Sequence, residues 1–282
     1  GYHYRTREPP LNTLERSVIE DIETVLGENP GSRPLTRDDA VERMRSGLPP
    51  RWRHLLDRYS DLSTTGRRRV SYHVAARFRA LGELTPLALD DRIRIGDVSG
   101  DYIVIHTQDF APIETDFPPE TPFLDRFLRD RLDSYSVRFQ GVSIPVTVFR
   151  RHLLGADTFD ASYAVTEPEQ FPGDRELIEE TKRRLRESPP TDVLDDPAAS
   201  VETRARTLLR RRLLFHDVGL LDRLGGFFRR FIPGISNETS DPMGAESSER
   251  LDDLTYYVLR DLVGDGPLTI PIRDPAIRAV EA

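Results

Sequence analysis

The spacing of hydrophobic residues predicts an amphipathic helix near the C-terminal end of the chain. The apolar positions recur at i, i+3, i+7 and i+11, so they lie on one face: Leu251, Leu254, Val258 and Leu262. Ser248 has a side chain that can cap the first turn. Gly264 and Gly266 tolerate positive φ and Pro267 cannot continue a helix, so we expect the helix to end there.

A second, shorter helix is expected after this turn. Asp274 would cap its first turn, and Pro275 would take the first helical position, where proline is favoured. Ile277 and Val280 would then face the core.

Shifting the sequence by 184 positions aligns this region with an earlier one. Residues 72–94 match residues 256–278 at eight of 23 positions without a gap, which indicates an internal repeat. Gly82 corresponds to Gly266 at the turn, and Asp90 corresponds to Asp274 at the predicted cap. After the first copy, residues 98–101 predict a turn and Tyr102–His106 predict a strand.

The rest of the N-terminal half predicts helices followed by strands, and hence an α+β fold. Residues 1–66 are expected to form a small helical subdomain of three short helices. The first begins at Asn12 with Glu15, the second begins at Thr36 with Asp39, and the third spans residues 51–62. Residues 67–168 form an α+β domain in which a helix covers an antiparallel sheet. The helix would begin at Thr121 and carry Phe123, Leu124, Phe127, Leu128 and Leu132. The strands are predicted by alternating apolar residues from Val137 to Val148, with Gly141 at a turn.

Residues 169–247 predict a helical region with loops, and residues 248–282 begin the second copy of the repeat. Asp174 is expected to cap a helix that ends at Glu187, and an acidic link follows over residues 188–197. Ser200 is expected to cap a long arginine-rich helix. Apolar residues at helical spacing occupy positions 220–231, Pro233–Gly234 would stop that helix, and residues 235–247 predict a surface loop.

Composition restricts the possible functions of the chain. The 282 residues carry a net charge of −8, and 39 of the 40 basic residues are arginine, with Lys182 the single lysine. This balance is typical of a protein from a high-salt cytoplasm encoded by a GC-rich genome, with codon bias alone as the alternative. The acidic excess disfavours non-specific nucleic-acid binding, which needs an uncompensated basic face. Cysteine is absent, which excludes disulfides and thiolate chemistry. No apolar run approaches the ~20 residues needed to cross a bilayer.

The sequence contains no recognisable catalytic or nucleotide-binding motif. A phosphate loop needs glycines before a lysine, and Lys182 follows Glu179, Glu180 and Thr181, so we expect it to be a solvated helix residue. The six histidines lack the spacing of a zinc hydrolase helix, and the carboxylate doublets fall on predicted exposed faces or caps. The sequence therefore assigns no catalytic, cofactor-binding or metal-binding residue.

Two segments are candidates for interaction. The clusters Arg67–Arg69 and Arg210–Arg212 offer guanidinium groups that suit acidic partners, although pairing within the chain is an alternative. The segment that contains Phe227, Phe228 and Phe231 could dock on a membrane platform or in a partner groove, or else form a core stripe. The candidate interaction residues are Arg210, Arg211, Arg212, Phe227, Phe228 and Phe231.

The second copy resembles a sequence pattern of the archaeal type II/IV secretion-system ATPases. That pattern, Gly-Pro-Leu-x-Pro-Leu-Leu-x-Asp-Pro-x-Ile-Glu-Asp-Ile, precedes the ATPase core, and this chain has Gly-Pro-Leu-Thr-Ile-Pro-Ile-Arg-Asp-Pro-Ala-Ile-Arg-Ala-Val at residues 266–280. The chain differs at Ile270–Pro271, where the order is exchanged, and at Arg278–Ala279, which replace the acidic pair. The first copy keeps Gly82, Leu84, Pro86, Leu87, Asp90 and Ile93.

The resemblance implies a non-catalytic N-terminal region that positions a hexameric motor. It would couple ATP hydrolysis in the following core to pilus or archaellum assembly or to protein secretion. The implied partners are the chain's own ATPase core, neighbouring subunits and a membrane platform protein, on the cytoplasmic side of the cell membrane. ATP and magnesium are expected to bind that core. Because the chain begins with Gly1 and stops abruptly at Ala282, we expect it to be a piece of a longer protein.

Two other classes of function remain open. The chain could be a free-standing adaptor that kept the repeated fold without the motor and acts as a binding scaffold. It could also be an unrecognised hydrolase, which substitution of the histidines and carboxylate doublets would test. The secretion hypothesis requires a glycine-rich lysine loop further along the reading frame.

Overall fold

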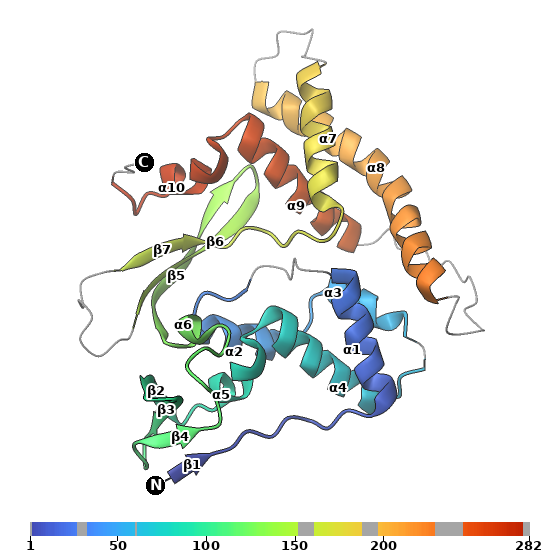
Figure 1. Ribbon diagram of the computed structural model, residues 1–282. Coiled ribbons are helices and arrows are strands. Elements are labelled where there is room, and N and C mark those ends of the chain that lie inside the picture. The colour runs from blue at the N-terminus through green and yellow to red at the C-terminus, as the bar shows by residue number, and fades with distance from the viewer. Residues whose placement is uncertain are drawn as a thin grey trace. The chain divides into compact units, whose positions relative to one another are not determined.

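The computed structural model describes residues 2–26, 33–59, 61–151, 161–187, 197–228 and 245–278. The chain divides into two compact units: Gly1–Ser136 with Pro145–Glu167, and Val137–Ile144 with Pro168–Ala282. Helices make up 52% and strands 20% of the structure, which agrees with the predicted α+β class at this level (Figure 1).

Four helices open the first unit: α1 (Thr13–Leu26), α2 (Arg37–Ser46), α3 (Pro50–Asp57) and α4 (Thr64–Val74). The capping box predicted at Asn12 and Glu15 is confirmed, and the helix start predicted at Thr36 and Asp39 is also a capping box. The backbone N–H of Glu15 donates to Asn12 Oδ1 at 2.9 Å while Asn12 N–H donates to the Glu15 carboxylate at 3.0 Å, and Thr36 and Asp39 make the same exchange before α2. The third helix ends at Asp57, five residues before the predicted end at residue 62.

The first copy of the repeat leads from α4 into a four-stranded sheet. After α4 come a π-helical turn η1 (Ala75–Arg79), a 3-10 turn η2 (Gly82–Leu84) and the short helix α5 (Thr85–Leu89). The sheet has the order β1 (Tyr2–Tyr4), β4 (Ile113–Thr115), β3 (Tyr102–Thr107) and β2 (Ile93–Ser99), with β1 parallel to β4 and the other pairs antiparallel. The predicted strand at 102–106 and the turn at Gly100 are confirmed.

The long helix predicted from Thr121 is wrong. Only α6 (Leu124–Phe127) is helical, because Phe123 takes a left-handed conformation with φ 68° and strand β5 (Arg129–Phe139) begins two residues after α6. Leu132 lies in β5 and is 48% exposed. Leu124, Phe127 and Leu128 are nevertheless buried in the same apolar cluster as the sheet residues Ile103 and Ile105.

A second sheet joins β5 to β6 (Val142–Arg151) and β7 (Ser162–Val165), in that order. The turn between β5 and β6 is formed by Gln140 and Gly141, which have φ values of 47° and 80°, as a two-residue hairpin turn requires. The two predicted strands and the turn at Gly141 are therefore confirmed. The tip of this hairpin, Val137–Ile144, belongs to the second unit.

Three helices dominate the second unit: α7 (Asp174–Glu187), α8 (Pro197–Phe228) and α9 (Ala245–Leu262), which pack against one another (Figure 1). Helices α8 and α9 begin three residues before the predicted caps, so Ser200 and Ser248 lie within their first turns. Proline at the first position of α8 favours this earlier start. Residues 188–196 of the predicted acidic link lie outside the described residues, as do 229–244, which include Pro233–Gly234 and most of the predicted loop.

The second short helix precedes Asp274 instead of following it. After α9 come a 3-10 turn η3 (Gly266–Leu268) and α10 (Thr269–Arg273), and Asp274 is the residue at which α10 ends. The described chain from Pro275 to Arg278 forms a turn, so the predicted cap at Asp274 is wrong. Asp274 Oδ1 accepts the backbone N–H of Ala276 at 2.8 Å, which holds this turn in place of a helix.

The two copies of the repeat have the same local structure. Gly82 and Gly266 have φ values of 59° and 61°, and the residues that end α5 and α10, Asp90 and Asp274, have φ/ψ values of −81°/104° and −77°/115°. Each copy places a 3-10 turn directly before a five-residue helix, with an offset of 184 positions. The backbone geometry therefore supports the internal repeat indicated by the sequence.

A buried threonine hydroxyl ties each copy together. Thr85 Oγ1 accepts the N–H of Leu81 at 3.1 Å and donates to the carbonyl oxygen of Ala76 at 3.3 Å. Thr269 Oγ1 accepts the N–H of Asp265 at 2.8 Å and donates to the Arg260 carbonyl oxygen at 3.3 Å, and both threonines are 0% exposed. The hydroxyl thus links the end of the long helix to the short one in both copies.

Replacing either hydroxyl should destabilise the protein. We expect Thr85→Val and Thr269→Val each to lower the free energy of unfolding by about 2 kcal/mol, because each leaves a buried N–H and a carbonyl without that hydroxyl. Urea unfolding followed by circular dichroism measures the loss. Thr→Ser at the same positions retains the hydroxyl and should cost less; a Val variant as stable as the wild type would contradict the assigned role.

Candidate functional site

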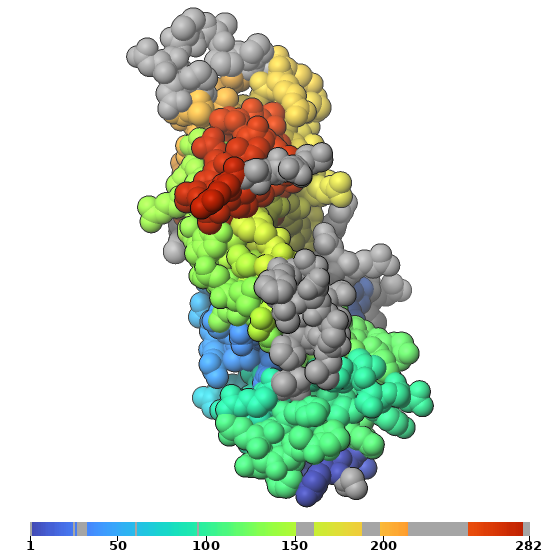
Figure 2. All heavy atoms as spheres, turned by 90° about the vertical axis from the view of Figure 1, so that its left-hand side faces the viewer, coloured from blue at the N-terminus to red at the C-terminus, as the bar shows by residue number. Residues whose placement is uncertain are grey.

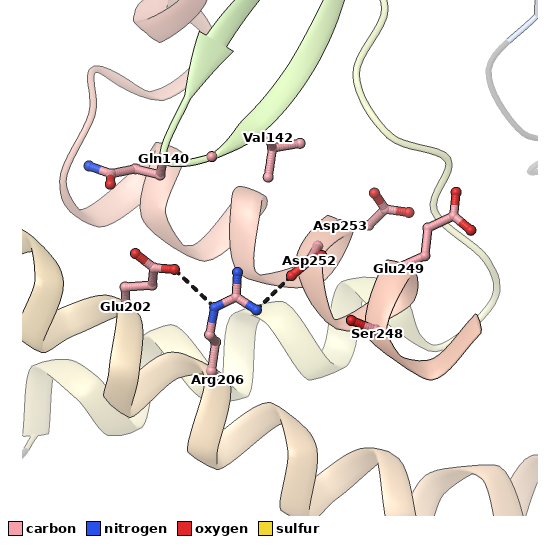
Figure 3. Close-up of a pocket in the computed structure, with 9 residues that line it drawn as sticks. Gln140, Val142, Glu202, Arg206, Ser248, Glu249, Asp252 and Asp253 are labelled. Atoms are coloured by element: carbon pink, nitrogen blue, oxygen red, sulfur yellow. Dashed lines mark hydrogen bonds and ion pairs between the residues drawn. The ribbon is translucent and has the colours of Figure 1, made fainter. Parts of the chain in front are cut away.

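A hollow in the second unit lies beside the tip of the β5–β6 hairpin. It has a volume of about 760 Å³ and is lined by the hairpin turn, by α8 and by the first two turns of α9 (Figure 3). The lining residues are Gln140, Gly141, Val142, Glu202, Arg206, Ser248, Glu249, Asp252 and Asp253.

Arg206 is the central polar residue of this hollow. Its Nε donates to Glu202 Oε1 at 2.9 Å, one turn earlier on α8, and another guanidinium nitrogen donates to Asp252 Oδ1 on α9 at 2.6 Å (Figure 3). Burial alone would lower the pKa of Arg206, but the hydrogen bonds to Asp252 and Glu202 outweigh burial and raise it above its ordinary value. Arg206 is therefore a permanently charged link between α8 and α9.

The hollow has more negative than positive charge. Glu249 and Asp253 line the same hollow as the Glu202–Arg206–Asp252 group, so the lining carries four carboxylates and one guanidinium. Among the described residues no group of three or more His, Asp or Glu side chains is arranged to hold a metal ion. Ser248 has no histidine beside it among the lining residues, so the hollow offers an acidic surface that suits a cation and holds no activated nucleophile.

The predicted interaction residues on α8 are placed only in part. Arg210, Arg211 and Arg212 are exposed, and Arg212 pairs with Glu180 on α7 at 3.5 Å. The backbone of Phe227 and Phe228 continues α8, but their side chains are not among those described, and Phe231 lies outside the described residues. These six residues therefore stay a predicted interaction surface, of which only the three arginine side chains lie among those described.

The other arginine cluster pairs within the first unit. Arg69 donates two hydrogen bonds to Glu15, whose side chain is 2% exposed, and Arg67 pairs with Asp57. Arg69 thus joins α4 to the capping box at the beginning of α1. Arg67 and Arg69 therefore pair within the chain, which was the alternative to pairing with an acidic partner.

Lys182 is not the solvated residue that the sequence suggested. It is 6% exposed, and its Nζ donates to Glu179 at 2.5 Å and to Asp261 on α9 at 2.7 Å. Burial alone would lower the pKa of the ammonium group, but the hydrogen bonds to the two carboxylates outweigh it and raise that pKa. The single lysine therefore joins α7 to α9.

Asp90 ties the N-terminal strand to the first copy of the repeat. It accepts the hydroxyl of Tyr4 at 2.7 Å and pairs with the Arg92 guanidinium at 2.6 Å. The hydrogen bond from Arg92 is the largest cause that holds the Asp90 pKa well below its ordinary value, and burial with the bond to Asp90 raises the pKa of Tyr4 to about 12. Tyr4 lies in β1, so Asp90 fixes that edge strand to the end of α5.

These contacts predict a dependence of stability on pH. Because the folded-state pKa of Asp90 is depressed, its contribution is fully present above the ordinary aspartate value of about 4 and is lost as the pH falls below it. We expect the stability difference between wild type and Asp90→Asn to shrink between roughly pH 5 and pH 2. Urea midpoints across that range measure it; a constant difference would contradict this origin.

Comparison with known proteins finds no match among protein families, curated proteins or solved structures. Of the helices that the structure describes, none combines the length and apolar character needed to cross a membrane.

Proposed function

We propose that this chain is a non-catalytic region that precedes the ATPase core of an archaeal type II/IV secretion motor. It would position a hexameric motor and couple ATP hydrolysis in that core to pilus or archaellum assembly or to protein secretion. The observation that carries the proposal is the repeated unit. Its turn, short helix and terminal aspartate have the same geometry at Gly82 and Gly266, the residues on which the resemblance depends.

The polar contacts of the second unit support a positioning role. Arg206 joins α8 to α9, and Lys182 joins α7 to α9, so charged pairs connect all three helices. The hollow at Arg206 presents carboxylates around an already neutralised guanidinium, which suits docking of a basic group better than bond-breaking chemistry. A set of helices joined in this way could serve as a rigid unit that contacts neighbouring subunits.

The reading frame beyond Ala282 provides the first test. We expect a glycine-rich loop that ends in Lys-Ser or Lys-Thr within roughly 100 to 250 residues, since that loop cradles the phosphates of ATP. A frame without such a loop, together with a stable monomer that binds no ATPase, would favour the adaptor.

A biochemical test uses the longer polypeptide. The full chain should hydrolyse ATP and form hexamers in native mass spectrometry, whereas the 282-residue chain should bind no ATP in equilibrium dialysis. Removing the present region from the full chain should reduce hexamer formation. Hexamer formation and ATP hydrolysis that stay unchanged without this region would contradict a positioning role.

A further inference from the structure

The same face of the short helix is buried in one copy of the repeat and exposed in the other. In the first copy the face consists of Leu84 at the end of η2 and Leu87 of α5, both 0% exposed, and Ala88 of α5, which is 2% exposed. The corresponding residues of the second copy, Leu268, Pro271 and Ile272, are named the α10 face. Leu268 is 40% exposed and Ile272 is 52% exposed. The two copies therefore differ in how far this face is covered.

The remainder of α10 is packed as in the first copy. Thr269 is 0% exposed and Ile270 is 1% exposed, so α10 is firmly held on the end of α9. The C-terminal segment that contains α9 and α10, coloured red, is at the molecular surface in Figure 2. The exposure of the α10 face therefore belongs to a well-packed element.

Helix α2 covers the equivalent face in the first copy. It packs against α5, and its Ala40, which is 0% exposed, shares one apolar cluster with Leu84, Leu87 and Ala88. Val41 and Met44, on the same side of α2, pack against that cluster. The cover thus consists of an apolar helical stripe at i, i+1 and i+4.

Helix α2 also supplies a charged contact. Arg37, the first residue of α2, donates to the carbonyl oxygens of Ala88 at 3.1 Å, Asp90 at 2.6 Å and Ile93 at 2.7 Å. These oxygens lie at and beyond the C-terminal end of α5, where the helix dipole is negative. The guanidinium is therefore complementary to the end of the short helix.

The second copy offers the same acceptors. The backbone turns in the same way after Asp274, where the N–H of Ile277 donates to the Asp274 carbonyl at 3.1 Å, as Ile93 donates to Asp90 at 3.1 Å. Among the described residues, no side chain donates to the carbonyl oxygens of Ile272 and Ile277, which correspond to those of Ala88 and Ile93. The α10 face thus combines exposed apolar side chains with carbonyl oxygens that suit a guanidinium.

We propose that the α10 face binds an amphipathic helix of a partner protein, and that this helix has the chemistry of α2. It carries an arginine in its first turn, which donates to the Ile272 and Ile277 carbonyl oxygens, and apolar residues three, four and seven positions later, which cover Leu268 and Ile272. The inference does not depend on the proposed function, because it compares two parts of one chain.

A labelled peptide tests the proposal directly. A fluorescein-labelled peptide of residues 34–48, which contains α2 and its capping box, should bind the 282-residue chain saturably in fluorescence anisotropy. Ile272→Asp should weaken binding about tenfold or more, because a charge replaces an apolar side chain that the peptide covers. A peptide that carries Arg37→Gln should also bind more weakly. No binding to the wild type, or equal binding to Ile272→Asp, would overturn the proposal.

Matched controls distinguish the α10 face from an exposed apolar side chain elsewhere on the chain. Leu132→Asp changes an equally exposed leucine, 48% accessible on β5 of the first unit, and should leave binding unchanged. The peptide could instead displace the chain's own α2 from α5. In that case Ile272→Asp would leave the binding of the peptide unchanged, which would count against the proposal. Sedimentation of the wild type gives the remaining outcome: a dimer that Ile272→Asp dissociates would identify a second copy as the occupant and overturn a partner protein.

Discussion

Replacing Tyr256 by alanine should lower the free energy of unfolding by about 3 to 5 kcal/mol, the usual cost of removing a large buried aromatic ring. Tyr256 is 0% exposed, and its ring meets Phe139 edge-on at 6.1 Å and Tyr257 at 5.2 Å between centroids. It therefore joins α9 to the tip of the β5–β6 hairpin within the second unit. Urea unfolding followed by far-ultraviolet circular dichroism measures the loss.

The repeat provides the control for this variant. Tyr72 occupies the position equivalent to Tyr256 but is only half-buried, so Tyr72→Ala should cost about 1 kcal/mol. Tyr256→Phe, which keeps the ring, should also cost less than Tyr256→Ala. Trp52 is the single tryptophan and lies in the first unit, so its fluorescence shows whether that unit is folded. Equal losses for Tyr256→Ala and Tyr72→Ala would contradict the packing described.

Asp174→Ala should also be strongly destabilising, by about 3 to 5 kcal/mol, because it removes one partner of a buried ion pair. Asp174 is 1% exposed; one carboxylate oxygen accepts the Arg250 guanidinium at 3.0 Å, and the other accepts the N–H of Phe171 at 2.9 Å. The side chain of Arg250 is only 12% exposed, so this charge would lose its buried carboxylate. Differential scanning calorimetry should show a lower Tm.

An exposed ion pair of the same unit gives the comparison. Asp252 is 41% exposed and pairs with Arg206, so Asp252→Ala should cost less than about 1 kcal/mol. Asp174→Asn retains an acceptor for the Phe171 N–H, so its loss of unfolding free energy should lie between those of Asp174→Ala and Asp252→Ala. If Asp174→Ala were no more destabilising than Asp252→Ala, burial would not explain the importance of the pair.

The predictions that succeeded rest on chemistry between neighbours in the sequence. Capping boxes at Asn12 and Thr36, and glycines with positive φ at Gly82 and Gly266, depend on residues within a few positions of one another. Such contacts form wherever the local backbone allows them. The repeat was visible because residues that shape its local structure, among them the turn glycines Gly82 and Gly266 and the threonines Thr85 and Thr269, match between the copies.

The failures have non-local causes. Residues 123–132 have an apolar spacing that fits a helix, but pairing with β6 extends the chain from Arg129, and the left-handed Phe123 limits the helix to four residues. Asp274 followed by proline carries the signals of a helix start, although the end of α10 uses the same residue. Local signals do not distinguish these alternatives.

The candidate site could not be assembled from the sequence. Arg206 meets Asp252 across 46 positions, and Lys182 meets Asp261 across 79, and neither pair has a spacing pattern. The arginine-rich segment and the Asp252–Asp253 doublet were noticeable, but which arginine pairs depends on the packing of α8 on α9. The exposure of Ile272 was equally hidden, since Ala88 occupies the same repeat position and is buried.

The β5–β6 hairpin has a practical consequence for dissecting the chain. Its tip supplies Phe139 to the second unit, while most of both strands belongs to the first, so no single cut separates the two units. A fragment that begins at Pro168 would keep α7, α9 and Tyr256 but lose the ring that Tyr256 packs against. Isolating the first unit therefore requires removal of residues 137–144 and a new join from Ser136 to Pro145, besides a cut before Pro168.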